Sequence, residues 1–181
     1  MEKSEKKKKQ AVTHGNDLPM EQQFETIFNM SLSLICIADI ETATFIKVNP
    51  SFKRVLGYEE AELLSKPFFD FIHPEDVQKT IDLVNNELKK GSKVINFQNR
   101  YRSRDGSYKC LDWTSHPDPE RGITYAIAND ITEQKKNLLA LEESEKNLRT
   151  IIDLVPHFIF AKDVKGRFIL ANKAVADNFN L

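Results

Sequence analysis

Cysteine and histidine are the residue types of this chain that could carry metal or nucleophilic chemistry, because thiolates and imidazoles act as metal ligands and as nucleophile–base pairs. The 181 residues contain two cysteines, Cys36 and Cys110, and four histidines, His14, His73, His116 and His157. Neither cysteine stands in a paired spacing such as Cys-x-x-Cys, and no motif places an imidazole beside a thiol. The sequence therefore predicts no metal site and no catalytic residue, and both cysteines are interpreted as inert core residues on strands.

The composition is that of an ordinary globular domain, with 40% hydrophobic and 29% charged residues. A net charge of −1 gives no reason to expect a nucleic-acid partner. No apolar run approaches the ~20 residues of a membrane-spanning helix, and the basic stretch Lys6–Lys9 is not followed by the apolar core of a signal peptide. Two cysteines are too few for a disulfide scaffold, so the expected location is the cytoplasm.

The first part of the chain alternates between polar and patterned segments. Residues 1–19 are polar and are expected to form a disordered leader. Apolar residues at helical spacing predict a flanking helix, and two strands that pair as a hairpin should follow it. Two short helices are expected next, the first of them ended by Gly57. These elements are expected at Met20–Met30, Leu34–Ala38, Phe45–Asn49, Ser51–Leu56 and Glu59–Leu64.

A longer helix should begin after His73, whose position at the helix start favours a capping role. Its apolar stripe consists of Val77, Ile81, Val84 and Leu88. Three strands bounded by turn residues are then expected at Val94–Arg104, Tyr108–Ser115 and Ile123–Ala128. Two strands, several short helices and three further strands predict an α+β fold, in which a five-stranded antiparallel sheet carries short helices over one face.

A linker helix is expected directly after the last strand, over residues 131–155. Asp130 can cap this helix, and Glu133 stands where it would complete a capping box. A heptad pattern predicts a short coiled coil. Its two seam positions are occupied by Ile131, Leu138, Glu145 and Ile152, and by Gln134, Leu141, Leu148 and Val155.

The beginning of the patterned region recurs near the end of the chain. The residues Thr26-Ile27, Ile35, Asp39, Phe45-Ile46 and Asn49 return as Thr150-Ile151, Ile159, Asp163, Phe168-Ile169 and Asn172. Residues 148–181 are therefore interpreted as the truncated start of a second copy of the same domain, and the chain as part of a longer protein.

Residues 20–133 resemble the PAS domain with its C-terminal PAC extension, and residues 148–181 resemble the start of a second PAS domain. The string at Asp130–Lys135 is the most specific signal, because an acidic residue followed by Ile-Thr-Glu recurs at the PAC exit helix. The matching stretches are Asp39, Phe45–Phe52, Leu56–Tyr58, Phe71–Asp76, Asp105-Gly106, Trp113 and Asp130–Lys135.

The resemblance implies a sensory and dimerising module of a bacterial or archaeal signalling protein. Such a module relays a change induced by a ligand or partner through its C-terminal helix to an output domain, most often a histidine kinase and sometimes a diguanylate cyclase. The sequence contains no motif of either enzyme, so no enzymatic activity is expected of these residues. The alternative is a ligand-free scaffold for dimerisation, and a homodimer is expected under both hypotheses.

The resemblance also bears on cofactors. Haem-binding members usually ligate iron through a histidine on the long helix, and no histidine lies between Asp76 and Lys90. Photoreceptor members carry an Asn-Cys-Arg-Phe-Leu-Gln string whose cysteine attacks flavin, and no such string occurs here. Haem and covalent flavin are therefore disfavoured and no cofactor is predicted, while non-covalent flavin or another small ligand stays open.

Strand alternation and the resemblance to ligand-binding members together suggest a pocket between sheet and helices. Its candidate residues are Cys36, Ala38, Phe97, Asn99, Tyr101, Leu111 and Trp113. The alternative is that Tyr101 and Trp113 fill the core, with their polar tips hydrogen-bonded. On the opposite face of the sheet, Tyr125 and Ile127 should not face water, so the helix Met20–Met30, a second subunit or both are expected to cover them.

Two residues at the exit of the domain are the candidate signal relay. Asp130 would belong both to the last strand and to the cap of the linker helix, so that a shift in the sheet moves the helix. Thr132 in the first turn can hydrogen-bond back to the core, a role that the resemblance also suggests. The alternative for Asp130 is a plain helix cap without a part in signalling.

Overall fold

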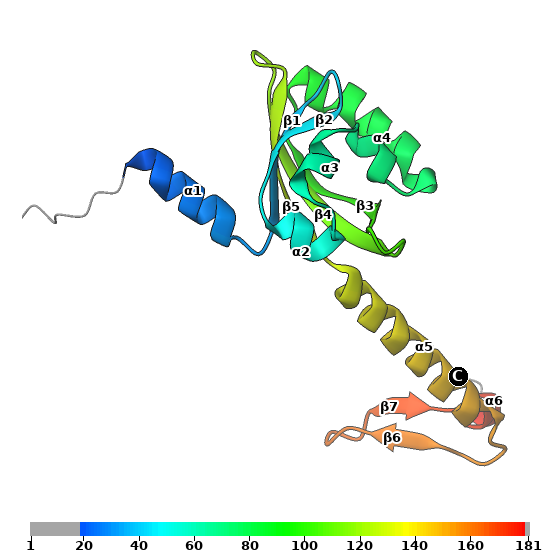
Figure 1. Ribbon diagram of the computed structural model, residues 1–181. Helices are drawn as coiled ribbons and strands as arrows, with labels where there is room; N and C mark the ends of the chain where they lie inside the picture. Colours follow the sequence, from blue (N-terminus) through cyan, green and yellow to red (C-terminus); the bar gives the residue numbers. More distant parts are fainter. Residues whose placement is uncertain (1–18, 180–181) are drawn as a thin grey trace, which may run out of the picture.

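Figure 1 shows a computed structural model of the protein, which describes residues 19–179. Five strands form an antiparallel sheet in the order β2-β1-β5-β4-β3. Helices cover one face of this sheet, which confirms the predicted α+β fold. The strands are β1 (Leu34–Asp39), β2 (Thr44–Val48), β3 (Val94–Arg102), β4 (Tyr108–Asp118) and β5 (Ile123–Asp130). The helical elements over the sheet are α2 (Ser51–Leu56), α3 (Glu60–Leu64), the 3-10 turn η1 (Phe68–Phe71), α4 (Pro74–Asn86) and the 3-10 turn η2 (Leu88–Lys90).

Local signals begin and end these helices as the sequence predicts. Helix α2 stops at Gly57, whose φ of 79° lies in the left-handed region that costs glycine nothing. At the start of α4, the Nδ1 atom of His73 accepts a hydrogen bond from the amide of Glu75 at 3.2 Å. The capping role of His73 is therefore confirmed.

Helix α4 packs differently from the predicted stripe. Its buried residues are Asp76, Thr80 and Val84, whereas Val77 and Ile81 are only half-buried. The helix is rotated because Asp76 contacts the open edge of the sheet, where its Oδ2 atom accepts a hydrogen bond from the amide of Arg100 at 2.7 Å. A sheet edge leaves such backbone groups unpaired, so the start of α4 protects the edge formed by β3.

Three predicted strand ends are wrong by a few residues. Strand β3 ends at Arg102, before Arg104; β4 continues past Ser115 to Asp118; and β5 continues past Ala128 to Asp130. Beyond Ser115, strand β4 pairs with β5 alone, and a proline such as Pro117 is tolerated at such an edge position. Turn-forming residues in the sequence therefore do not mark where the hydrogen-bonded pairing of the strands ends.

The helix α1 (Met20–Met30) projects away from the sheet in Figure 1. Its buried residue is Phe28. The outer side chains of β5 stay partly open, with Tyr125 42% and Ile127 47% exposed. Helix α1 of the same chain therefore does not cover these two side chains, and a covering second subunit stays a prediction. The leader predicted over residues 1–19 lies, apart from Pro19, outside the described residues.

The linker helix α5 spans Thr132–Leu154, so the predicted seam residues Ile131 and Val155 only flank it. The predicted capping box at its start is wrong. The carboxylate of Glu133 pairs with Lys136 Nζ at 2.9 Å, because a side chain in the exposed first turn is free to take the nearer charged partner. The seam residues Leu138, Leu141 and Leu148 are exposed in the single chain, and the coiled coil stays a prediction.

Beyond α5, an antiparallel hairpin is formed by β6 (Phe160–Lys162) and β7 (Phe168–Ala171), followed by α6 (Lys173–Phe179). Figure 1 shows that α5 leads from the sheet to this hairpin. Over residues 19–179, no helix combines the length and apolarity needed to cross a membrane.

Candidate functional site

A cavity of about 60 Å³ lies between the sheet and the helices. Its floor consists of small side chains on three adjacent strands. Ala126 of β5 stands opposite Cys36 of β1 on one side and opposite Ser115 of β4 on the other, so these side chains share one face. Ala38 and Thr124 extend the same floor. The cavity exists because the central strands carry small residues on the face that the helices cover.

Bulky apolar side chains form the roof of the cavity. Leu83 and Val84 come from α4, Leu88 from η2, Phe68 from η1 and Phe45 from β2. The lining contains no Asp, Glu, Lys or Arg. The site is thus a largely apolar cavity with a few polar side chains.

All predicted pocket residues except Leu111 line this cavity. Leu111 is fully buried but belongs to the adjoining core. Trp113 is 7% exposed, and its ring lies 5.5 Å from that of Tyr101, centroid to centroid. The two aromatic rings therefore belong to the hydrophobic core and also form one wall of the cavity. The lining residues that were missed fall into two groups. The strand residues Phe45, Ser115, Thr124 and Ala126 were not among the candidates, and Phe68, Thr80, Leu83, Val84 and Leu88 come from helical elements whose packing the strand pattern does not reveal.

A chain of hydrogen bonds runs from the cavity wall into α4. The indole Nε1 of Trp113 donates to Asn99 Oδ1 at 2.9 Å, and Asn99 Nδ2 donates to Thr80 Oγ1 at 3.2 Å. Thr80 Oγ1 in turn donates to the carbonyl of Asp76 at 2.8 Å. A buried network of this kind fixes the positions of its side chains when every polar group in it has a hydrogen-bond partner.

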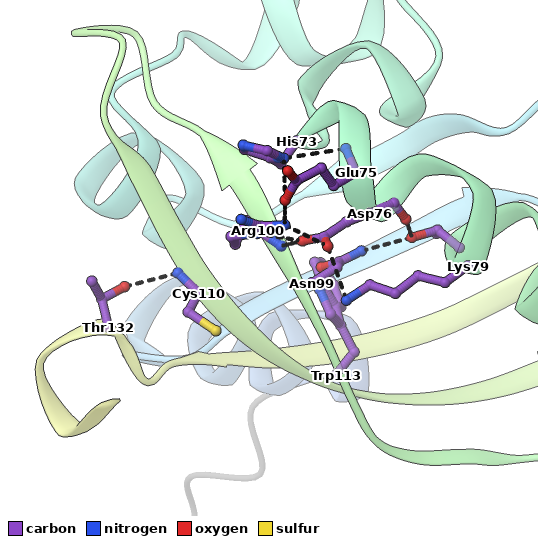
Figure 2. Close-up of polar contacts among 10 residues, drawn as sticks. His73, Glu75, Asp76, Lys79, Asn99, Arg100, Cys110, Trp113 and Thr132 are labelled. Carbon is purple, nitrogen blue, oxygen red and sulfur yellow. Dashed lines mark hydrogen bonds and ion pairs between the residues drawn. The ribbon is translucent and has the colours of Figure 1, made fainter. Parts of the chain in front are cut away.

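The same turn of α4 carries an ion pair that the sequence reasoning did not find. Arg100 binds Asp76 through two hydrogen bonds, from Nε to Oδ2 at 2.8 Å and from the guanidinium NH2 group to Oδ1 at 2.9 Å (Figure 2). Lys79 Nζ lies 3.1 Å from the same carboxylate, which is 5% exposed. Its bonds with Arg100 hold the pKa of Asp76 well below its usual range. The i, i+4 spacing of Asp76, Thr80 and Val84 could have predicted that these three residues share the buried face of α4.

Burial disfavours the charged forms of the two titratable side chains that line the cavity, Cys36 and Tyr101. Burial raises the pKa of the Cys36 thiol to about 12. Burial likewise raises the pKa of Tyr101 well above its ordinary value. Desolvation has this effect because a low-dielectric environment disfavours the ionised form of an acid. Residues 19–179 contain no group of three His, Cys, Asp or Glu side chains that could hold a metal ion.

The joint between sheet and linker helix is held by both predicted relay residues. Thr132 Oγ1 accepts a hydrogen bond from the amide of Cys110 on β4 at 2.8 Å (Figure 2). Asp130 Oδ1 accepts from the amide of Thr132 at 2.9 Å and also contacts its hydroxyl. The amide of Ile131 donates to the Cys110 carbonyl at 2.9 Å. The first turn of α5 is thus tied to β4 by bonds on both sides of Cys110.

Residues 34–130 thus form an α+β domain, in which short helices cover one face of a five-stranded antiparallel sheet around a small cavity. Residues 45–127 match the family described as "PAS fold". Residues 45–127 therefore have the PAS fold, which is the fold of sensory domains in signalling proteins.

Two relatives are similar to this chain over different lengths. Sporulation kinase E of Bacillus subtilis (strain 168) is 26% identical over 161 residues, which is 89% of this chain and 21% of that protein. The aryl hydrocarbon receptor nuclear translocator homolog of Drosophila melanogaster is 27% identical over 104 residues, which is 58% of this chain and 15% of that protein. This chain thus spans about a fifth or less of the curated relatives it matches.

Solved structures share the fold. A domain of a sensory box sensor histidine kinase/response regulator from Geobacter sulfurreducens gives a TM-score of 0.53 at 20% identity, covering 61% of this chain and 93% of that one. The PAS domain of an HTR-like protein from Haloarcula marismortui gives 0.52 at 25% identity, covering 61% of this chain and 91% of that one.

Proposed function

We propose that this chain is the sensory and dimerising part of a larger cytoplasmic signalling protein, whose output domain is a histidine kinase. A change in the cavity would pass through β4 and β5 to α5 and from there to the output domain. Residues 148–181 would begin a second PAS domain. The similarity to Sporulation kinase E supports this reading, because it extends over 89% of the chain and therefore beyond the PAS fold itself.

The observation that carries the proposal is the bonding of α5 to the sheet. Thr132 joins Cys110 of β4 to Asp130 of β5 through one hydroxyl group. Any movement of one strand relative to the other must therefore change the bonds that orient the first turn of α5. A helix that left the sheet through an unbonded loop could not respond in this way.

The test replaces Asp130 by Ala in the parent protein and measures autophosphorylation, with and without stimulus. The relay predicts a folded protein with altered basal or stimulated output. Asp39→Ala is the matched control, because Asp39 Oδ1 also accepts two hydrogen bonds in a turn, from the amides of Glu41 and Thr42, and Asp39 pairs with Ile123 at the opposite end of β5 from Asp130. Equal output from both variants and the wild type would contradict the relay.

Dimerisation through α5 is tested by placing a charge on its seam. Leu141→Lys should weaken self-association, measured by sedimentation, because Leu141 is exposed in the single chain and lies on the predicted seam. Leu139→Lys is the control, since Leu139 is equally apolar and exposed but lies off the seam. Equal dissociation constants for the two variants would exclude this seam as the contact.

A ligand-free scaffold is the second candidate function. The small size of the cavity favours it, since sites for small molecules commonly measure ~300–1,000 Å³ against about 60 Å³ here. It predicts that filling the cavity, for instance with Ala126→Leu, leaves the stimulated output unchanged.

A further inference from the structure

We propose that an open cleft between the end of α2 and the turn that joins β3 to β4 binds a phosphate group, carried by inorganic phosphate or by a small phosphate ester. The cleft has a volume of about 520 Å³ and shares no lining residue with the cavity between sheet and helices. Three properties of the cleft support a phosphate ligand: an excess of basic side chains, their weak pairing with carboxylates, and a fixed connection between its two sides.

Basic side chains outnumber acidic ones around the cleft. Arg54 comes from α2, Arg104 from the turn after β3, and Lys109 from the start of β4. Among the described residues of the lining, Asp105 is the one acid, and its Oδ1 atom already accepts hydrogen bonds from the amide and the hydroxyl of Ser107. Three basic side chains and one acidic one leave an excess of two positive charges. A phosphate group, with a charge of about −1.5 to −2 at neutral pH, matches this excess.

Arg54 carries a charge that no carboxylate within residues 19–179 pairs with. Its guanidinium NH2 group donates to the carbonyl of Ser31 and to the hydroxyl of Ser51, both at 2.5 Å, and both acceptors are neutral. A guanidinium group has five N–H donors, so these bonds occupy only part of it. An anion in the cleft would supply the missing counter-charge.

The other two basic side chains pair only loosely with acids. A guanidinium nitrogen of Arg104 lies 3.6 Å from Glu62 Oε1, and Lys109 Nζ lies 3.8 Å from Asp130 Oδ2. Both distances exceed the ~2.7–2.9 Å of a hydrogen bond between charged groups. Phosphate oxygens can accept such bonds at the shorter distance, and the planar fork of an arginine matches them with two parallel bonds.

The two sides of the cleft are fixed relative to each other. The amide of Arg104 donates to the carbonyl of Leu56, the last residue of α2, at 2.8 Å. Gly57 approaches the turn so closely that a Cβ atom there would lie 3.4 Å from that of Arg104. The turn itself is closed by the amide of Ser103, which donates to the carbonyl of Ser107 at 2.7 Å. A site whose backbone is already ordered loses less free energy when it binds a ligand.

Lys109 connects the cleft to the joint between sheet and linker helix. Its ammonium group faces Asp130, and Asp130 Oδ1 accepts from the amide of Thr132. Hydrogen bonds from Ser107, and to a smaller extent the charge of Lys109, lower the pKa of Asp105, so Lys109 is attracted by two carboxylates. A phosphate group that binds Lys109 would weaken its attraction to Asp130 and change the charge beside the first turn of α5. The binding site is independent of the proposed function, and only this effect on α5 rests on it.

The experiment titrates the full ¹⁵N-labelled chain with inorganic phosphate, with glycerol 3-phosphate and with acetate, at constant ionic strength and about pH 7.5, where phosphate groups are mostly dianionic. Both phosphates should cause saturable shifts of the amides of Gly57, Arg104 and Lys109, with a dissociation constant in the roughly millimolar range. Acetate should bind at least about fivefold more weakly, because its single charge gains less from the three basic side chains.

Variants of two neighbouring arginines test the site. Arg104→Gln should weaken the binding of both phosphates about fivefold or more, because it removes a charged bidentate donor. Its thermal midpoint should equal that of the wild type, since the side chain of Arg104 is 59% exposed. Arg102→Gln is the matched control, because Arg102 is exposed and lies on β3 two residues away but does not line the cleft. It should change the dissociation constants less than about twofold.

The two phosphates distinguish the source of the group. Tighter binding of glycerol 3-phosphate would assign the site to an ester, and equal or weaker binding would assign it to inorganic phosphate. Acetate binding as tight as that of the phosphates, unchanged binding by Arg104→Gln, an equal loss in Arg102→Gln or no saturable binding would each overturn the site.

The effect on α5 has its own readout. Saturation with phosphate should shift the amide of Thr132 in the wild type and not in Lys109→Gln, and saturation without this shift would overturn the link to α5. The relay is measured independently through the output of Asp130→Ala. An altered Asp130→Ala output without any phosphate binding would remove the phosphate site and leave the proposed function standing.

Discussion

Asn49 and Asn172 occupy equivalent positions in two hairpins of the same chain. Asn49 Oδ1 accepts from the amide of Ile35 at 3.0 Å, while its Nδ2 donates to the carbonyls of Phe28 and Ser33 at 3.0 and 2.9 Å. Asn172 Oδ1 accepts from the amide of Ile159 at 3.0 Å. Its Nδ2 donates to the carbonyls of Ile152, Val155 and His157 at 3.0, 3.1 and 2.8 Å. Each asparagine thus binds its hairpin to the last turn of the preceding helix, α1 in one case and α5 in the other.

The turns of the two hairpins are also built alike. Asp39 Oδ1 accepts from the amides of Glu41 and Thr42, and Asp163 Oδ1 accepts from those of Lys165 and Arg167. These amide donors lower the pKa of both carboxyl groups. The repeat in the sequence is therefore a repeat of local hydrogen bonding.

The two hairpins differ in how much of their apolar surface is buried. Strand β1 pairs with β5 on its other edge, whereas β6 pairs with β7 alone among the described strands. Phe45 on β2 is 5% exposed, and its counterpart Phe168 on β7 is 49% exposed. A short segment thus encodes its own turns and clamps, but its apolar face is buried only where the other strands and helices of a domain are present.

The largest effect is expected from the core of the complete domain. Trp113→Ala should lower the free energy of unfolding by ~3–5 kcal/mol, because it removes a buried ring and the hydrogen bond to Asn99. Phe158→Ala, at a half-exposed ring near the second hairpin, should change it by less than ~0.5 kcal/mol. Urea denaturation followed by circular dichroism measures both. A loss below ~1 kcal/mol for Trp113→Ala would mean that the ring lines a loose pocket and does not fill the core.

The second-largest effect on the free energy of unfolding is expected from Asn49, which binds the first hairpin to α1. Asn49→Ala leaves the Ile35 amide and two carbonyls without their partner, so a loss of about 2–4 kcal/mol is expected in the same measurement. Asn172→Ala serves as its counterpart and should leave the main unfolding transition within ~0.5 kcal/mol of the wild type. Equal losses for the two variants would indicate that the second hairpin unfolds together with the first domain.

The ion pair on α4 should make stability depend on pH. Arg100 lowers the pKa of Asp76 in the folded state, so its stabilising contribution is present above the unfolded pKa of ~3.9 and is lost as the pH falls further. Because Arg100 is partly exposed, we expect a contribution of only about 1–2 kcal/mol at pH 7. Unfolding of wild type and Asp76→Asn between pH 7 and 3 measures it: their difference should shrink below pH 4. A constant difference over this range would contradict the assignment.

The smallest effect is local and needs a residue-level probe. Amide hydrogen exchange should be slow in β5, which is paired on both sides, and fast in Phe160–Lys162, where one edge is open. Asn172→Ala should further speed exchange of the Ile159 amide, whose acceptor is removed. Protection of β6 equal to that of β5 would show that another surface covers the second hairpin.

Much of the domain could be predicted because its signals are local. The start of α4 at His73, the end of α2 at Gly57 and the in–out alternation of β5 each depend on residues close together in the chain. The bonds between Asp130 and Thr132 could be predicted for the same reason, because the two residues are close in the chain. The bond from Cys110 to Thr132 could not, because Cys110 lies on a different strand. The capping box failed because Glu133 had a nearer partner, Lys136, on the exposed surface.

The sequence by itself determined the elements, their order and the inward face of each strand, since backbone sterics and alternation act over a few residues. Tertiary structure alone decided that Asp76 faces Arg100, because the rotation of α4 depends on how the helix meets the edge of β3. It also decided the cavity. The cavity is the space left between Thr124 and Ala126 on the sheet and Val84 and Phe68 on the helical elements. Its volume changes when these elements shift by less than the width of a side chain, and the sequence does not reveal shifts of that size.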